Sequence, residues 1–429
     1  MRPIPSAATT VKQVEVAVFE GGYGIDWHED TAVAYNQSQD GVHIGLWGDP
    51  RVVEKVKPRL LRGDPPDLVT VTYLPIWRLV AAGELLTFND ALAVPAPGGN
   101  EPWGDLFIPG MLDLYKSGGE VFGVPTAFNL WVCWYNAALF RRHGWKVPRD
   151  WDELRALCEQ MQAAGVAPVA FQGKYPIYGV WTFFSLIYRI GGTAAINRIN
   201  ALEPGAWTHP EVVQAARLWQ GLAVARFQKG AMAMNHTESQ LEWVNGNAGL
   251  IFCGLWLYNE MKQSLPPEFE MRCFPVPAVP GGKGNREVHF GMGSEFMFVP
   301  AEARYPAEAK AFARHLVSPA QAPEMSRRTG IISPLKNGTP PEAVDTPLRS
   351  AIDVIRGADG FFGVRVDWLL LDWQTQVLAP HMGRLLSGAE TPEVFCRALE
   401  AGVHEAIADP RVIVPPVEPY DPAQFGEES

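Results

Sequence analysis

The 429-residue sequence is poor in cysteine and has no long apolar run. Its five cysteines are too few for a disulfide scaffold, and their odd number leaves at least one thiol unpaired, although it still allows one disulfide. Cys158 and Cys396 fall in helical patterns and the other three in strand-like runs, so we expect buried thiols that pack as small hydrophobic residues. No run reaches 18 apolar residues, which argues against a transmembrane helix.

Positive charge is scarce as well. Lys and Arg number 36 against 47 Asp and Glu, and the formal net charge of −11 argues against nucleic acid or an anionic membrane as the main partner. The first residues lack the apolar core of a signal peptide and the cysteine of a lipid anchor. We interpret residues 2–13 as the processed tail of a mature chain restarted at a methionine. The alternative is a cytoplasmic protein.

Motifs for catalysis and cofactor binding are missing too. The sequence has no GxSxG, HExxH, Walker A or CxxC motif, and its nine histidines show no metal-ligand spacing. Two glycine-rich segments, 22–24 and 291–293, lack the third glycine of a dinucleotide loop. We therefore expect no cofactor, no metal site and no catalytic residues. Glu20 and Glu295 form a carboxylate pair that in principle suits glycoside hydrolysis, so a carbohydrate-active α/β enzyme is the alternative.

Apolar and aromatic residues, in contrast, are abundant. A 47% hydrophobic chain of this length predicts two or three domain-sized units. Strand patterns over 14–19, 42–46 and 67–71 alternate with helical patterns over 27–36, 51–61 and 76–82, which predicts an α/β fold with a mostly parallel, doubly covered sheet. Further along, Asp150 begins a helix, and we expect capping boxes at Thr208 with Glu211 and at Thr237 with Gln240.

One of the fifteen tryptophans stands out by its position. Gly246 has the place of a helix-ending glycine, and Ala248 to Phe252 reads as a buried strand. That strand delivers Trp256 to its end, where ligands bind in open α/β folds. A flat ring there suits the apolar face of a sugar, so we predict Trp256 as a binding platform, ahead of a purely structural role.

Four segments resemble, in order, the extracellular solute-binding proteins of family 1, the maltodextrin-binding type. They are 63–89 with its Pro-Asp strand, 123–168 with its Val-Pro, Tyr-Asn, Leu-Phe and Trp-Asp-Glu-Leu elements, 245–256 with its Gly-Leu-Trp, and 305–334. Within that family, 174–202 and 236–261 are most similar to binding proteins for N-acetylglucosamine and diacetylchitobiose.

The resemblance implies a two-lobe periplasmic-binding-protein fold of class II. Lobe one would be 14–124 plus 291–333, and lobe two 125–287 plus 334–409. Residues 1–13 and 410–429 would be terminal extensions. The chain would cross between lobes several times, with a ligand cleft between them that closes by a hinge motion.

The same resemblance implies the carbohydrate-binding component of an ABC importer. Its partners would be a sugar and the transmembrane permease subunits, and we expect a periplasmic or extracellular monomer held at the membrane by the permease or by a removed lipid anchor. A maltodextrin, another sugar or a non-sugar solute are alternative ligands.

Candidate contacts follow from the strand ends and from the expected lobe crossings. Trp131 is as well explained by burial as by binding, and Tyr178 and Trp181 could equally be core residues of one helix face. Glu238 is better explained as a charge at a helix N-terminus. The predicted ligand-binding set is Trp256, Trp131, Asn129, Tyr175, Glu20, Tyr23, Tyr73, His236, Glu295, Trp368 and Asp372.

Overall fold

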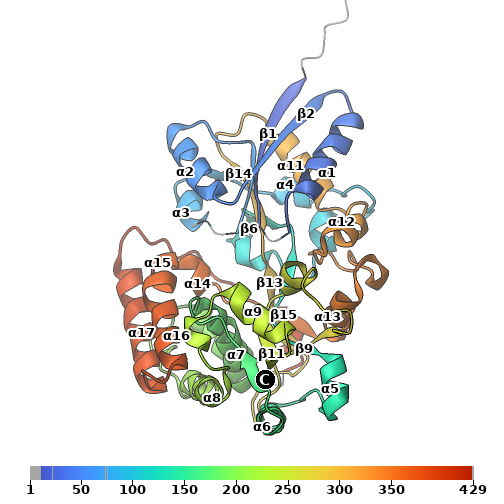
Figure 1. Ribbon diagram of the computed structural model, residues 1–429. Coiled ribbons are helices and arrows are strands. Elements are labelled where there is room, and N and C mark those ends of the chain that lie inside the picture. The colour runs from blue at the N-terminus through green and yellow to red at the C-terminus, as the bar shows by residue number, and fades with distance from the viewer. Residues whose placement is uncertain (1–10, 22, 73, 75, 428–429) are drawn as a thin grey trace, which may run out of the picture. The chain divides into compact units, whose positions relative to one another are not determined.

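The computed structural model describes residues 11–21, 23–72, 74 and 76–427 (Figure 1). The chain forms two compact units, Met1–Ala127 with Gly293–Pro340 and Phe128–Met292 with Pro341–Ser429. It therefore passes from one unit to the other three times, after Ala127, Met292 and Pro340. Both units combine sheets with helices, which confirms the predicted two-lobe α/β fold.

A six-stranded sheet forms the centre of unit 1. Its order is β2-β1-β3-β14-β4, and β7 also pairs with β14. The predicted alternation of strands and helices is confirmed, because β1, β2 and β3 are parallel. β14 runs antiparallel to β3 and arrives from more than 200 residues away, so the sheet is mixed. Its strands are β1 (Lys12–Phe19), β2 (Val42–Asp49), β3 (Leu68–Val71), β4 (Leu85–Leu86), β7 (Val124–Pro125) and β14 (Phe296–Pro300).

Helices and short segments complete unit 1. Trp103, fully buried, donates its indole N–H to the Val317 carbonyl at 2.6 Å and so ties distant parts of the chain together. The further elements are α1 (Asp26–Gln37), α2 (Val52–Arg62), α3 (Ile76–Ala81), α4 (Asn89–Leu92), η1 (Trp103–Leu106), η2 (Asp113–Tyr115), β5 (Lys116–Ser117), β6 (Glu120–Val121), α11 (Pro306–Leu316) and α12 (Ala322–Thr329).

Unit 2 contains a four-stranded sheet in the order β10-β11-β9-β12. β10 and β11 are parallel, while β9 is antiparallel to both β11 and β12. The carboxyl ends of β10, β11 and β12 therefore share one edge with the amino end of β9. A second sheet has the order β15-β13-β8. The strands are β8 (Phe128–Leu130), β9 (Val132–Asn136), β10 (Ala167–Ala170), β11 (Ala248–Cys253), β12 (Met271–Pro275), β13 (Val288–Gly293) and β15 (Gly360–Phe362).

Four helices of unit 2, α7, α8, α16 and α17, pack side by side (Figure 1). Trp219 on α8 is fully buried and donates to the Gly179 carbonyl of α7 at 2.9 Å. The helical elements of this unit are α5 (Ala137–His143), α6 (Trp151–Ala163), α7 (Ile177–Asn200), α8 (Pro210–Arg226), η3 (Ala231–Ala233), α9 (His236–Val244), α10 (Leu257–Met261), η4 (Pro341–Ala343), α13 (Thr346–Gly357), α14 (Val366–Leu369), α15 (Leu371–Trp373), η5 (Gln374–Leu378), α16 (Ala379–Leu386), α17 (Pro392–Ala408) and η6 (Pro422–Phe425).

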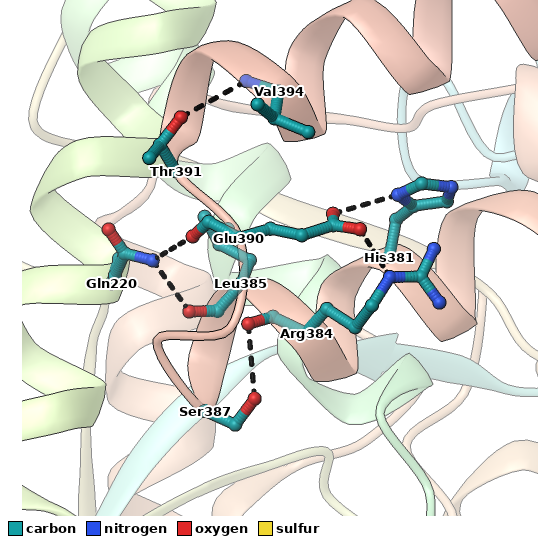
Figure 2. A network of polar contacts seen from close by, with 8 residues as sticks. All are labelled: Gln220, His381, Arg384, Leu385, Ser387, Glu390, Thr391 and Val394. Carbon is teal, nitrogen blue, oxygen red and sulfur yellow. Dashed lines mark hydrogen bonds and ion pairs between the residues drawn. The ribbon is translucent and has the colours of Figure 1, made fainter.

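A polar network fastens the turn between α16 and α17 to α8 (Figure 2). The Gln220 side-chain amide donates to the carbonyls of Leu385 at 2.8 Å and Glu390 at 2.6 Å. The Glu390 carboxylate lies 2.8 Å from Nδ1 of His381 and also pairs with Arg384. Gln220 thus satisfies one of the last backbone carbonyls of α16 and ties the turn after this helix to α8.

The predicted helix starts are only partly confirmed. Asp150 accepts a hydrogen bond from the Glu153 amide, as an N-cap should. The capping box at Thr208 and Glu211 is wrong, because α8 begins with Pro210 after His209 and has no side-chain cap. The box at Thr237 and Gln240 is also wrong. Asn235 and Glu238 form it two residues earlier, which gives Glu238 its expected place in the first turn of the helix.

A kink in α7 is fastened by the last residues of the chain. Gly192 has φ 64° and ψ −162°, a conformation that residues with a Cβ rarely adopt. The amide of the next residue, Thr193, donates to the Glu427 carboxylate at 2.9 Å. Asn197 and Tyr420 exchange two hydrogen bonds of 2.9 Å. The segment that the sequence predicts as a C-terminal extension thus packs on unit 2.

Replacing Gly192 with alanine is expected to destabilise unit 2. The new Cβ would enter a strained backbone region and lie 2.8 Å from the Glu427 carboxylate, so we expect a loss of about 2 kcal/mol in the free energy of unfolding. Urea unfolding of the variant measures it. Gly221→Ala on α8, where a Cβ meets no atom within 4 Å, is the control and should be neutral or stabilising. Equal stability of both variants would contradict the strain at Gly192.

Candidate functional site

Four aromatic side chains of unit 2 form one aromatic cluster: Trp131, Tyr178, Trp181 and Trp256. Every pair of rings has centroids between 4.9 and 6.3 Å apart. Interplanar angles of 47° to 78° show that the rings meet obliquely rather than as one flat stack. Such tilted arrangements are favourable for aromatic pairs and leave ring faces pointing in several directions.

The fold assembles the cluster at one edge of the four-stranded sheet. Cys253, the last residue of β11, pairs with Val132, the first residue of β9, so Trp256 and Trp131 follow and precede neighbouring strand ends. Tyr178 and Trp181 lie in the first turns of α7, which follows the carboxyl end of β10. Three segments that are distant in sequence therefore bring their rings to a common edge, as the strand pattern predicts for Trp256.

Neighbouring residues hold the turn that carries Trp256. A Cβ on Gly254 would lie 2.0 Å from the Trp256 ring, so only glycine allows the indole to fold back over the backbone. The Gly254 carbonyl accepts from the indole of Trp134 at 3.2 Å. The Leu255 amide donates to the side-chain oxygen of Asn129 at 2.9 Å. Asn129 is buried, and this bond gives it a positioning role beneath the cluster.

The four rings differ in exposure. Trp131 is buried and donates its indole N–H to the Thr182 hydroxyl at 2.9 Å, so it forms the base of the cluster. Trp256, Tyr178 and Trp181 are each half-buried. An oblique set of partly exposed rings over a buried one makes an apolar surface with several ring faces open to a ligand.

Polar side chains surround the cluster on α9 and on the loop before α7. Tyr175 is 45% exposed, and its ring lies 5.5 Å from the half-buried ring of His236. Glu238 accepts from the Asn235 amide within the capping box and lies 3.7 Å from the Lys174 ammonium. Glu238 is thus a helix cap, whereas Tyr175 and His236 present polar edges beside α7.

Glu260 is a carboxylate near Trp256 that the sequence-based set does not include. It lies one helical turn after Trp256, and its amide donates to the Trp256 carbonyl at 3.1 Å. The side chain is half-buried and accepts from the Gln240 amide at 2.6 Å. Burial raises the pKa of Glu260, while Gln240 and His236 act in the opposite direction. The sequence signal for Glu260 was its position four residues after Trp256, which predicts a shared helix face.

Unit 1 gathers a second group at the carboxyl ends of its parallel strands. Glu20 directly follows β1 and is exposed, and Tyr23 lies half-buried in the next loop. Glu295 precedes β14, which runs antiparallel to β3, so it lies at the same sheet edge. Its side chain is 6% exposed, and burial raises the pKa of this carboxyl to about 7. Tyr73 lies outside the described residues.

The late pair of predicted residues comes from two short helices of unit 2. Trp368 is half-buried in α14, and Asp372 is exposed in α15. The neighbouring Trp373 is buried, with its ring 5.3 Å from Trp207 and its indole N–H donated to the Leu399 carbonyl. Trp373 is therefore a packing residue, whereas the binding roles of Trp368 and Asp372 stay predictions.

The cysteines are free and buried: Cys133, Cys158, Cys253, Cys273 and Cys396. Burial raises the pKa of Cys158 and of Cys273 to about 12, which leaves these thiols protonated and unreactive. Within the described ranges, no group of three or more His, Cys, Asp or Glu side chains is arranged to hold a metal ion. Among the same residues, no helix combines the length and apolar character of a membrane span.

Comparison with known proteins assigns the chain to a family. Residues 28–323 match the model of the bacterial extracellular solute-binding proteins, and this match spans well over half of the chain. The chain belongs to this family. Its members bind solutes and are not enzymes, so the carbohydrate-active enzyme alternative is set aside.

Individual relatives are distant in sequence but similar in fold. A diacetylchitobiose-binding protein, NgcE of Streptomyces coelicolor, is 24% identical over 345 residues, which are 79% of this chain and 72% of the relative. The solved structure of a chitin oligosaccharide binding protein has a TM-score of 0.71 at 22% identity, covering 90% of this chain and 95% of that one. Apo RafE from Streptococcus pneumoniae has a TM-score of 0.74 at 18% identity, covering 94% and 99%. These structures establish the common fold.

Proposed function

We propose that this chain is the sugar-binding component of an ABC importer and that it binds an N-acetylglucosamine or chitobiose type of saccharide. The observation that carries the proposal is the aromatic cluster, in which half-buried Trp256, Tyr178 and Trp181 surround buried Trp131. The family match supports solute capture, and two relatives whose names refer to diacetylchitobiose and chitin oligosaccharides support the choice of ligand.

The cluster suits the chemistry of a pyranose ring. The two faces of a pyranose expose C–H groups, whereas its rim carries hydroxyl groups that donate and accept hydrogen bonds. A half-buried indole such as that of Trp256 covers one apolar face, and oblique neighbours shield its edges. Polar groups nearby, including His236, Tyr175 and Glu260, then supply partners for the rim. In unit 1, Glu20, Tyr23 and Glu295 are proposed as further polar contacts.

The bound sugar would be delivered to a permease and would not be chemically changed. We propose a periplasmic or extracellular protein that works as a monomer and hands its sugar to the transmembrane permease subunits. The formal net charge of −11 fits this role, since it disfavours retention on anionic surfaces.

A thermal-shift panel tests the proposed function. Diacetylchitobiose, N-acetylglucosamine, maltose and raffinose are each added to the purified chain at 1 mM. A ligand present at 100 times its Kd stabilises the folded state by about 2.7 kcal/mol, so a cognate sugar should raise Tm by several degrees. We expect the largest rise with diacetylchitobiose. If none of the four sugars changes the Tm, the sugar proposal is contradicted. A rise with maltose alone would instead assign a maltodextrin as the ligand.

A further inference from the structure

Glu260 lies one helical turn after the tryptophan that we propose as the sugar platform. Glu260 lies in the short helix α10 and follows the N-cap residue of that helix, Trp256, by four residues, a spacing that places two side chains on the same helix face. Its backbone amide donates to the Trp256 carbonyl at 3.1 Å, so the two residues share one turn of backbone. The side chains of Trp256 and Glu260 therefore leave the backbone from the same turn and the same face.

The Glu260 carboxylate is only partly used by the protein. Gln240 donates to Oε2 at 2.6 Å, and it is the one hydrogen-bond donor to this carboxylate in the part of the chain that the structure describes. An ionised carboxylate offers about four acceptor positions, so acceptor capacity is left over. The side chain is half-buried rather than sealed, which makes this capacity accessible to a ligand.

The surroundings fix the orientation of Glu260. Gln240 is buried on α9, on the same helix face as His236 and Ser239. Burial raises the pKa of Glu260, and Gln240 and then His236 oppose this shift. Because Gln240 holds one carboxylate oxygen, the remaining acceptor positions are preorganised.

We propose that Glu260 is a specificity-determining residue that accepts a hydrogen bond from the N–H of a 2-acetamido group on the sugar ring stacked against Trp256. This inference rests on the proposed function. An ionised carboxylate can only accept, and an amide N–H can only donate, so the two groups match in one orientation. A charged acceptor also makes the stronger kind of hydrogen bond. The acetamido methyl group meanwhile suits the apolar rings that surround Trp256.

Calorimetric titration of Glu260→Gln with diacetylchitobiose and with cellobiose tests this role. The two disaccharides share their linkage and differ in the 2-acetamido groups. Glutamine keeps the shape of the side chain and an oxygen for Gln240, but it replaces the charged acceptor by a neutral one. We expect a roughly tenfold loss of affinity for diacetylchitobiose, a smaller loss for cellobiose measured by displacement, and an unchanged Tm of the free protein.

Glu242→Gln on α9 is the matched control, since this half-buried carboxylate accepts from Asn247 and lies on a different face from Gln240. Its affinities should equal those of the wild type. Affinity of Glu260→Gln for diacetylchitobiose within twofold of the wild type would overturn the inference while leaving the proposed function intact. Equal losses for the two disaccharides would overturn the acetamido assignment. A wild-type chain that binds neither sugar would sink the proposed function, and this inference with it.

Discussion

Trp256→Ala should weaken saccharide binding roughly 30- to 150-fold, the effect of removing a hot-spot residue worth about 2–3 kcal/mol. The Trp256 ring is half-buried and contacts each of the other three members of the aromatic cluster, so its loss removes an indole face from this edge. The fold should survive, because the ring packs over Gly254 rather than within a strand. Isothermal titration with diacetylchitobiose measures the loss.

Trp47→Ala provides the control for a general effect of losing a tryptophan. Trp47 is also half-buried, but it lies on β2 in unit 1, where its indole N–H donates to Glu15 at 2.8 Å. We expect its affinity to stay within twofold of the wild type. If Trp256→Ala binds as tightly as Trp47→Ala, the aromatic cluster is a packing element and the platform assignment is wrong.

Glu295→Gln should stabilise the protein by about 3 kcal/mol at pH 8 and leave its stability unchanged at pH 4. Burial raises the pKa of this carboxyl from 4.5 to about 7 in the folded chain, and a shift of that size corresponds to about 1.4 kcal/mol per unit. Between these values the folded chain holds a proton that the unfolded chain has lost. Stability is therefore full below about pH 4.5 and falls as the pH rises to 7.

The glutamine variant mimics the protonated carboxyl, so its stability does not fall in this way as the pH rises. Urea unfolding of the variant and of the wild type at pH 4, 6 and 8 measures the difference in stability. A stability difference that does not change with pH would mean that folding does not shift the pKa of Glu295, which would contradict the effect of burial. In the expected case, Glu295 can donate as well as accept near neutral pH, which broadens the sugar groups it could contact in unit 1.

Local patterns were sufficient for much of the fold. The alternation of apolar strands and amphipathic helices predicted β1, β2 and β3 with their helices, because that signal lies within each segment. The place of β14 in the same sheet depends on pairing Phe296 with Val71, and no local pattern encodes a partner that far away. The capping boxes failed for a related reason. Several residues near each helix start have side chains that can cap, and the loop geometry selects Asn235 over Thr237.

The sequence predicted the position of Trp256 at a strand end, while its role in binding stays a prediction. Trp256 followed from a buried strand with a glycine after it, a combination that marks a strand end. Tyr178 and Trp181 could not be separated from core residues, because a spacing of three suits a buried helix face as well as a ligand surface. Asn129 proves to support the Trp256 turn, a role that depends on the contact with Leu255. Glu260 was missed because its neighbours on α9 are distant in sequence.

A crystal structure of the chain with diacetylchitobiose tests the central claim most directly. The account expects one sugar ring to stack on Trp256, with its edge against Tyr178 or Trp181 and its acetamido group at Glu260. A sugar bound away from the aromatic cluster, with the Trp256 ring uncovered, would contradict it.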